Sequence, residues 1–253
     1  MAVKLSAELL GEAFERARAD WRRRRADETF EVAPARPMAA AFTIAISRER
    51  GAGGSEIARE IGKQLGWAVY DRELLERIAE EAGLRTELLR SIDEKRSHWL
   101  VELLETFGGA SAMSGCAYVR HVAETMLALA LRGECVIVGR GGTAILPPET
   151  TLRIRVVAPV GDRVKRVARE QGISEAKAAH DIHQTDADRA AFVKGYFHEE
   201  LTDEHHYDLT INTSRIAVEE AAGIVIDALR RRQAANRAAS NREQPEATGS
   251  AAR

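Results

Sequence analysis

A glycine-rich segment, residues 47–55 (SRERGAGGS), has the composition of a loop that binds phosphate groups. Gly51, Gly53 and Gly54 allow a tight turn whose backbone N–H groups can point at phosphate oxygens. The hydroxyl of Ser55 follows directly, where it could cap a helix or bind Mg²⁺. The segment departs from the common pattern G-x-x-x-x-G-K-[ST], because Gly54 stands where that pattern has lysine. An ordinary glycine-rich turn between a strand and a helix is the alternative interpretation of this segment alone.

Several arginines occupy positions where a guanidinium group could bind phosphate. Arg48 and Arg50 flank the glycine turn, and Arg140 lies in a Gly-Arg-Gly-Gly segment that lets a ligand approach the backbone closely. Three more recur every third residue, on one face of a predicted helix: Arg163, Arg166 and Arg169. Arg189 follows in the next segment. The alternative is that these arginines form a solvated surface paired with nearby carboxylates.

The elements that would position these residues alternate between strands and helices. Short apolar runs rich in β-branched residues predict strands at 42–46, 67–70, 135–138, 152–157 and 208–211. Segments with apolar residues at helical spacing lie between the runs. This alternation predicts an α/β fold with a parallel sheet that is covered on both faces. Since ligands bind beyond the carboxyl ends of the strands in such sheets, the residues that follow the runs are expected to form the site.

Composition divides the 253 residues into three parts. Residues 1–40 predict a helical arm with a linker, residues 41–232 the folded domain, and residues 233–253 a disordered tail. The basic run at 22–25 is interpreted as a solvated helix end, and docking on an anion, a phosphate backbone or a membrane surface is the alternative. With 37 Lys and Arg against 39 Asp and Glu, the net charge is −2, which argues against a protein that binds nucleic acid through a generally basic surface. The 2 cysteines exclude a disulfide scaffold, and no apolar stretch predicts a signal peptide or a membrane span, so a soluble cytoplasmic protein is expected.

Five longer blocks carry a family resemblance: ISRERGAGGSEIAREIGKQLGWAVYDRELL, ECVIVGRGGTAIL, TLRIRVVAPVGDRVKRVAREQGIS, TDADRAAFVKGYF and YDLTINTSRIAVEEA. In this order, across about residues 42–230, they resemble the cytidylate kinase-like family, a relative of bacterial cytidylate kinase among the P-loop nucleoside monophosphate kinases. The resemblance implies a P-loop kinase-type three-layer α/β/α fold with a five-stranded parallel sheet and a helical lid at about 160–202. It also implies ATP and Mg²⁺ as cofactors, a small-molecule nucleotide as partner, and γ-phosphoryl transfer to CMP or dCMP.

The resemblance assigns roles to the residues that match the motifs of this family. Donor phosphates would be held by Gly51, Gly53, Gly54 and Ser55, with Mg²⁺ on the Ser55 hydroxyl. The charge of the missing lysine would come from Arg48 or Arg50. The transferring group would be held by three lid arginines: Arg163, Arg166 and Arg189. The acceptor would be bound by Asp71, Arg140 and Asp186.

Five positions depart from the kinase pattern. In the loop, Gly54 replaces the lysine, Arg48 replaces the first glycine, and Ser47 replaces the aspartate before the loop. At the Gly-Arg turn, Val138 replaces the preceding aspartate and Gly141 replaces the acidic residue after the arginine. Asp71 directly precedes a predicted helix, so it could cap that helix, contact the acceptor or do both. Two alternatives to the cytidylate kinase reaction stay open: a kinase for another small metabolite, and a nucleotide-binding sensor or scaffold of the same fold that transfers nothing.

Overall fold

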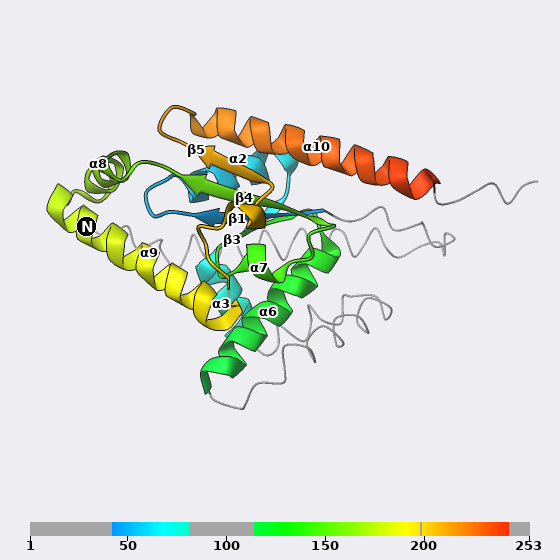
Figure 1. Ribbon diagram of the computed structural model, residues 1–253, viewed down its shortest axis with the longest axis horizontal. Helices are drawn as coiled ribbons and strands as arrows, with labels where there is room; N and C mark the ends of the chain where they lie inside the picture. Colours follow the sequence, from blue (N-terminus) through cyan, green and yellow to red (C-terminus); the bar gives the residue numbers. More distant parts are fainter. Residues whose placement is uncertain (1–41, 81–113, 198, 243–253) are drawn as a thin grey trace, which may run out of the picture.

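A five-stranded sheet forms the centre of the structure (Figure 1). The computed structural model describes residues 42–80, 114–197 and 199–242. The strands are β1 (Thr43–Arg48), β2 (Ala68–Tyr70), β3 (Cys135–Val138), β4 (Thr151–Val157) and β5 (Leu209–Asn212). The helices are α2 (Gly54–Leu65), α3 (Arg72–Glu80), α6 (Ser114–Arg132), α7 (Gly142–Ile145), α8 (Val160–Gln171), α9 (Glu175–Phe197), the 3₁₀ turn η1 (Glu204–His206) and α10 (Val218–Arg242).

The strand order is β2-β3-β1-β4-β5, and every neighbouring pair is parallel. β1 is central, with Ile46 beside Val138 of β3 and Ile154 of β4. Because these strands run in one direction, the loops after β1 and β3 leave the same edge of the sheet. The predicted α/β fold with a five-stranded parallel sheet is confirmed, and the observed strands agree with the predicted runs to within 2 residues at each end.

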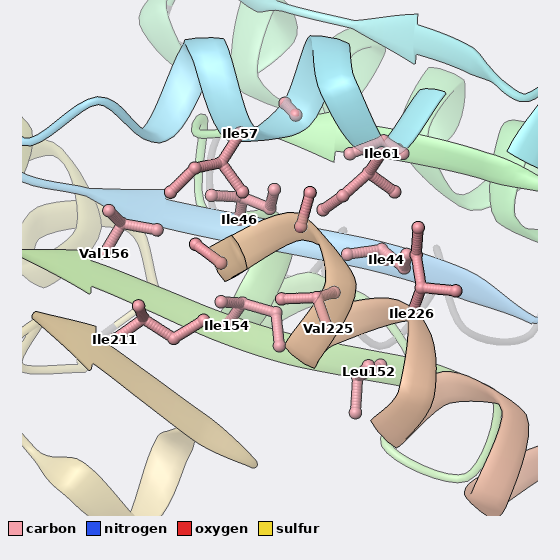
Figure 2. Packing of buried hydrophobic residues seen from close by; sticks show 14 of the residues in the cluster. Ile44, Ile46, Ile57, Ile61, Leu152, Ile154, Val156, Ile211, Val225 and Ile226 are labelled. Carbon is pink, nitrogen blue, oxygen red and sulfur yellow. The ribbon is translucent and has the colours of Figure 1, made fainter. Parts of the chain in front are cut away.

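One face of the sheet packs against α2 and α10. Ile44 and Ile46 of β1 point to this face and join an apolar cluster that includes Ile57 and Ile61 of α2 and Val225 of α10 (Figure 2). The two isoleucines share a face because side chains alternate along a strand. Burying an isoleucine stabilises the fold by about 1.5–3 kcal/mol. This packing fixes the two elements that flank the glycine-rich loop.

The opposite face of the sheet packs against α3, α6 and α7. Ala45 of β1 and Ile137 of β3 contribute to this second cluster, together with Leu75 of α3 and Met126 of α6. Figure 1 shows the two layers of helices on either side of the sheet, as the three-layer prediction requires.

Helices α8 and α9 cover one end of the sheet (Figure 1). They form a small apolar cluster of their own from Val164, Val167, Ala168, Ala178 and Ile182. These two helices lie within the range predicted for a helical lid, about 160–202, and their role as a lid stays a prediction.

The prediction of disorder from residue 233 is wrong for residues 233–242, because α10 continues to Arg242. Asn236 donates a hydrogen bond to the carbonyl of Glu149 at 3.2 Å, and Arg232 forms an ion pair with Asp208 at 2.7 Å. These contacts, together with alanine-rich sequence that favours helix, extend α10 although it carries few large apolar residues there. The remaining tail at 243–253 and the predicted arm at 1–40 lie outside the described residues.

Within 42–80, 114–197 and 199–242, no helix is both long and apolar enough to span a membrane.

Candidate functional site

The glycine-rich loop connects β1 to α2 through two left-handed residues, Gly51 (φ +80°) and Gly53 (φ +81°). The loop is fastened at Ala52, whose N–H donates to the Glu49 carbonyl at 3.2 Å and whose carbonyl accepts from the Thr213 hydroxyl at 2.7 Å. Gly53 is the N-cap of α2 and supplies no side-chain cap. The first N–H groups of a helix lack partners within the helix, so this terminus suits an anion.

A pocket of about 130 Å³ lies in front of this helix terminus. Its wall includes all four residues predicted to hold donor phosphates: Gly51, Gly53, Gly54 and Ser55. Four guanidinium side chains also line it: Arg48, Arg50, Arg166 and Arg189. Pockets for whole small molecules are usually about 300–1,000 Å³. The space therefore suits phosphate groups.

The stem of Arg48 lies over Gly54, and its guanidinium group lies over Gly139 at the end of β3. Burial, together with the positive charge of Arg189, lowers the pKa of Arg48 to about 10. In the part of the chain that is described, the Nε atoms of Arg48 and Arg50 are buried without hydrogen-bond partners. The local surplus of positive charge indicates a site for an anion.

Two lid arginines reach the loop from α8 and α9. Arg166 donates from Nη1 to the Gly51 carbonyl at 3.4 Å, and Arg189 donates from Nη1 to the Arg48 carbonyl at 3.1 Å. Burial lowers the pKa of Arg189, the nearby Asp186 raises it, and Arg50 and Arg72 lower it. Both side chains therefore line the pocket, and their contact with the transferring group stays a prediction.

Arg163 is brought to the same loop but not to the pocket wall. Its side chain is 7% exposed, and its Nε donates to the Ala158 carbonyl at 2.9 Å. Nη1 donates to the Arg50 carbonyl at 3.1 Å and forms an ion pair with Asp186 at 2.6 Å. These internal contacts join α8 to the loop. They indicate that Arg163 positions the loop, in contrast to the predicted contact with the transferring group.

Asp186 of α9 contacts the glycine-rich loop, whereas the sequence predicted contact with the acceptor. Its Oδ1 accepts a hydrogen bond from the Arg50 backbone N–H at 2.8 Å. Its two oxygens also lie 2.6 Å from Arg163 and 3.5 Å from Arg189. All three partners are donors of the loop or the lid.

Asp71 caps α3, as one of its two predicted roles requires. Its Oδ1 accepts from the Leu74 N–H at 3.0 Å, and its carbonyl accepts from the Leu75 N–H at 3.0 Å. Its negative charge also acts on Arg48, whose pKa it raises. Asp71 thus lies near the cationic cluster while serving as a cap.

Arg140 occupies a strained turn after β3. Three consecutive residues are left-handed: Gly139 at φ +81°, Arg140 at +54° and Gly141 at +75°. The arginine forms an ion pair with Glu76, and its Cζ lies 5.1 Å from the ring centroid of Phe192. Burial, together with the charge of Arg72, lowers its pKa to about 10. A non-glycine residue held in this region is typical of a functional position.

Sequence reasoning missed Glu49, which lies between Arg48 and Arg50. Its Oε2 accepts from the Ala158 N–H at 3.2 Å and lies 3.4 Å from Nε of Arg163. The other carboxylate oxygen of Glu49, Oε1, lies 3.6 Å from Nη2 of Arg155. A carboxylate within a run of arginines beside a glycine turn was the signal that could have found it.

Phe192 and Glu76 were also missed. They flank Arg140 from α9 and α3, and the ring of Phe197 packs against Gly141. No local sequence pattern connects these residues, because they come from three separate elements.

The residues present fit a Mg²⁺ ion that arrives on a nucleotide. Ser55 lines the pocket together with the carboxylates of Glu56 and Glu170. Among the described residues, no group of three or more His, Cys, Asp or Glu is arranged to hold a metal. Val138 is 1% exposed and belongs to the apolar core, so β3 supplies no carboxylate at that position. Ligand phosphates and water would complete the coordination, as Mg²⁺ commonly allows.

Comparison with known proteins identifies the relatives of this chain. The model for the cytidylate kinase-like family matches residues 43–215. Cytidylate kinase of Aeropyrum pernix is 25% identical over 188 residues, which cover 74% of this chain and 98% of that protein. Uronate isomerase of Corynebacterium glutamicum is 33% identical over 98 residues, which cover 38% of this chain and only 19% of that protein. A solved structure of an uncharacterized protein from Eubacterium ventriosum has 20% identity and a TM-score of 0.61, covering 76% of this chain and 99% of that chain.

Proposed function

This chain belongs to the cytidylate kinase-like family, and from that premise we propose that it transfers the γ-phosphoryl group of ATP to CMP, dCMP or a similar small acceptor. The observation that carries the proposal is the cluster of buried cations between two loops. Arg48 lies beside the uncapped terminus of α2, and its guanidinium reaches the turn that carries Arg140. An arrangement of this kind can neutralise phosphates on both sides of the transferring group.

On the donor side, the N–H groups at the start of α2 bind the ATP phosphates. Arg48 supplies the positive charge that lysine supplies in the common pattern, since residue 54 is glycine. Arg166 and Arg189 hold the donor phosphates from the lid. Arg163 and Glu49 keep the loop in register with α8.

On the acceptor side, Arg140 binds the acceptor phosphate. A planar guanidinium can bind phosphate through two parallel hydrogen bonds. Phe192 and Glu76 orient this side chain before the acceptor arrives. Asp71 caps α3, and its negative charge acts on Arg48 of the cationic cluster. From this position its carboxylate can contact the acceptor.

Magnesium, bound with ATP, supplies charge neutralisation at the donor phosphates. Ser55 offers the hydroxyl ligand, with Glu56 and Glu170 in the same pocket wall. The protein contributes positioning and fixed charge rather than covalent chemistry.

An assay with ATP and Mg²⁺ against a panel of nucleoside monophosphates and other small metabolites tests the proposal. We expect phosphorylation of CMP or dCMP, with loss of at least about 100-fold in kcat for Arg48→Ala. Arg140→Ala should raise the KM for the acceptor. Rapid CMP turnover that persists in both variants would contradict the mechanism. Phosphorylation of a different acceptor, and not of CMP or dCMP, would show that this acceptor is the substrate.

A nucleotide-binding sensor that transfers nothing is the second candidate. It is favoured by Gly54 in place of lysine and by Val138 buried where a carboxylate would assist the metal. Calorimetry with ATP and Mg²⁺ separates the two functions. Binding of ATP without phosphorylation of any acceptor in the panel would support the sensor.

A further inference from the structure

The carboxylate of Asp186 lies where three hydrogen-bond donors converge. The Arg50 backbone N–H is 2.8 Å from Oδ1, the Arg163 guanidinium is 2.6 Å from Oδ2, and the Arg189 guanidinium is 3.5 Å from Oδ1. One donor belongs to the glycine-rich loop, one to α8 and one to α9. Without the carboxylate, these three donors would form an unoccupied binding site for an anion.

Two of the three donor residues adjoin the pocket for phosphate groups, and Arg163 lies behind them. Arg50 and Arg189 both line that pocket, and Arg189 also donates to the Arg48 carbonyl at 3.1 Å. Charge-assisted hydrogen bonds from N–H and guanidinium groups do not distinguish a carboxylate from a phosphate oxygen. An internal carboxylate in this position therefore competes with a ligand anion for the same donors.

We propose that Asp186 occupies an anion subsite formed by the Arg50 N–H, Arg163 and Arg189, and that a phosphate group of the donor polyphosphate displaces it. This inference rests on the proposed function and extends it to the regulation of the same pocket. Displacement breaks the hydrogen bond between Asp186 of α9 and the Arg50 N–H, whereas Arg189 of the same helix can still donate to the Arg48 carbonyl. Asp186 is thus an internal anion that occupies these donors until a polyphosphate binds them.

The proposal has an energetic consequence for binding. A ligand that must first displace a competing group binds with an apparent affinity reduced by the fraction of molecules in which the subsite is vacant. Removing the negative charge of Asp186 should raise that fraction and tighten polyphosphate binding. If Asp186 served only to shape the lid, its removal would loosen the pocket and weaken binding or leave it unchanged.

Titration calorimetry with inorganic tripolyphosphate, without Mg²⁺, tests this prediction on the full chain. Asp186→Asn keeps the shape of the side chain and an oxygen that accepts from the Arg50 N–H. We expect it to bind tripolyphosphate at least about tenfold more tightly than the wild type, a difference of about 1.4 kcal/mol. Equal or weaker binding, or no binding by either protein, would overturn the proposal.

The matched control is Asp188→Asn, two residues along α9. Asp188 is exposed and accepts a hydrogen bond from Gln184 at 2.8 Å, away from the loop. This variant loses the same charge, and we expect its affinity to stay within about twofold of the wild type. An equal gain in both variants would assign the effect to general charge and overturn the proposal.

Asp186→Ala provides a second variant if the asparagine protein does not fold, and thermal unfolding checks both. Failure of the proposed function gives a different result. Tighter tripolyphosphate binding by Asp186→Asn, with no turnover of any acceptor by the wild type, would retain the subsite and reject the kinase.

Discussion

The side chain of Arg48 lies directly over Gly54, so that a Cβ atom on residue 54 would be only 2.5 Å from the Cβ of Arg48 and 3.0 Å from its Cγ. Real Cβ atoms essentially never approach side-chain carbons so closely. An arginine at 48 in this conformation and a lysine at 54 therefore exclude each other. Because the closest contact is with Cβ, which every residue except glycine carries, the glycine at 54 is required by any side chain at 48 in this conformation.

An exchange of these two positions tests this relationship. Arg48→Gly alone should reduce kcat by about 10²- to 10³-fold because it removes a cation from the developing charge. Gly54→Lys alone should lower the free energy of unfolding by about 1–3 kcal/mol because the new side chain overpacks the site. The double variant should recover stability and a substantial part of the activity. Steady-state kinetics and denaturant unfolding measure the outcome, and a double variant no better than either single one would contradict the exchange.

Arg48 should also reduce the stability of the protein without ligand. Its pKa in the folded state is lowered to about 10, well below the ordinary value of an arginine. Below pH 10 both states hold the proton, so the cost of burying the charge is fully present, and it diminishes only as the pH rises above 10. At pH 7, Arg48→Met should therefore raise the free energy of unfolding by about 1–2 kcal/mol, within the few kcal/mol that the pKa shift implies. Urea denaturation without ligand checks the sign, and destabilisation would show that Arg48 is already compensated.

Gly53 should matter for ligand binding beyond its backbone conformation. A Cβ there would lie 2.5 Å from Nη1 of Arg166, the end of a flexible side chain that can move away. Gly66 ends the same helix at φ +68° with no atom within 4 Å of an added Cβ, so it is the matched control. Both alanine variants should lose about 1–2 kcal/mol of stability through left-handed strain. Only Gly53→Ala should weaken ATP binding, because it displaces Arg166; an equal effect on affinity in both variants would contradict this role.

The Phe192 ring should position Arg140 for the acceptor. Arg140→Lys keeps the charge but loses the planar fork and the stacking on Phe192, so the KM for CMP should rise by about 10- to 100-fold. Phe192→Leu should raise this KM by a smaller factor, and Phe192→Tyr should restore it. In each variant the KM for ATP should change by less than about twofold. Tyr196→Leu is the control. The ring centroid of Tyr196, which is also on α9, lies 5.1 Å from that of Phe192, but Tyr196 is itself 43% exposed. An increase in the KM for both CMP and ATP in Phe192→Leu would indicate general damage to the protein.

Local patterns predicted the framework of the fold because each strand is written in a few adjacent residues. The run from Thr43 to Ile46 is short, apolar and rich in β-branched residues, and the glycine turn that follows it could be recognised without any distant contact. The positions of Arg48 and Arg140 could also be anticipated, since parallel strands bring their carboxyl-end loops to one edge. The error at the end of α10 arose because contacts of Arg232 and Asn236 with residues far away in the chain stabilise that segment.

The amino-acid sequence by itself determined the α/β fold, the glycine-rich loop and the absence of lysine at residue 54. The tertiary structure alone decided which arginines line the pocket, because the direction of a long side chain depends on neighbours from other elements. It directed Arg163 into internal hydrogen bonds, kept Arg166 and Arg189 at the pocket wall, and brought Asp186 to the Arg50 N–H. The burial of these side chains and the compensation of their charges depend on contacts from several helices and strands. No single segment of the sequence therefore predicts them.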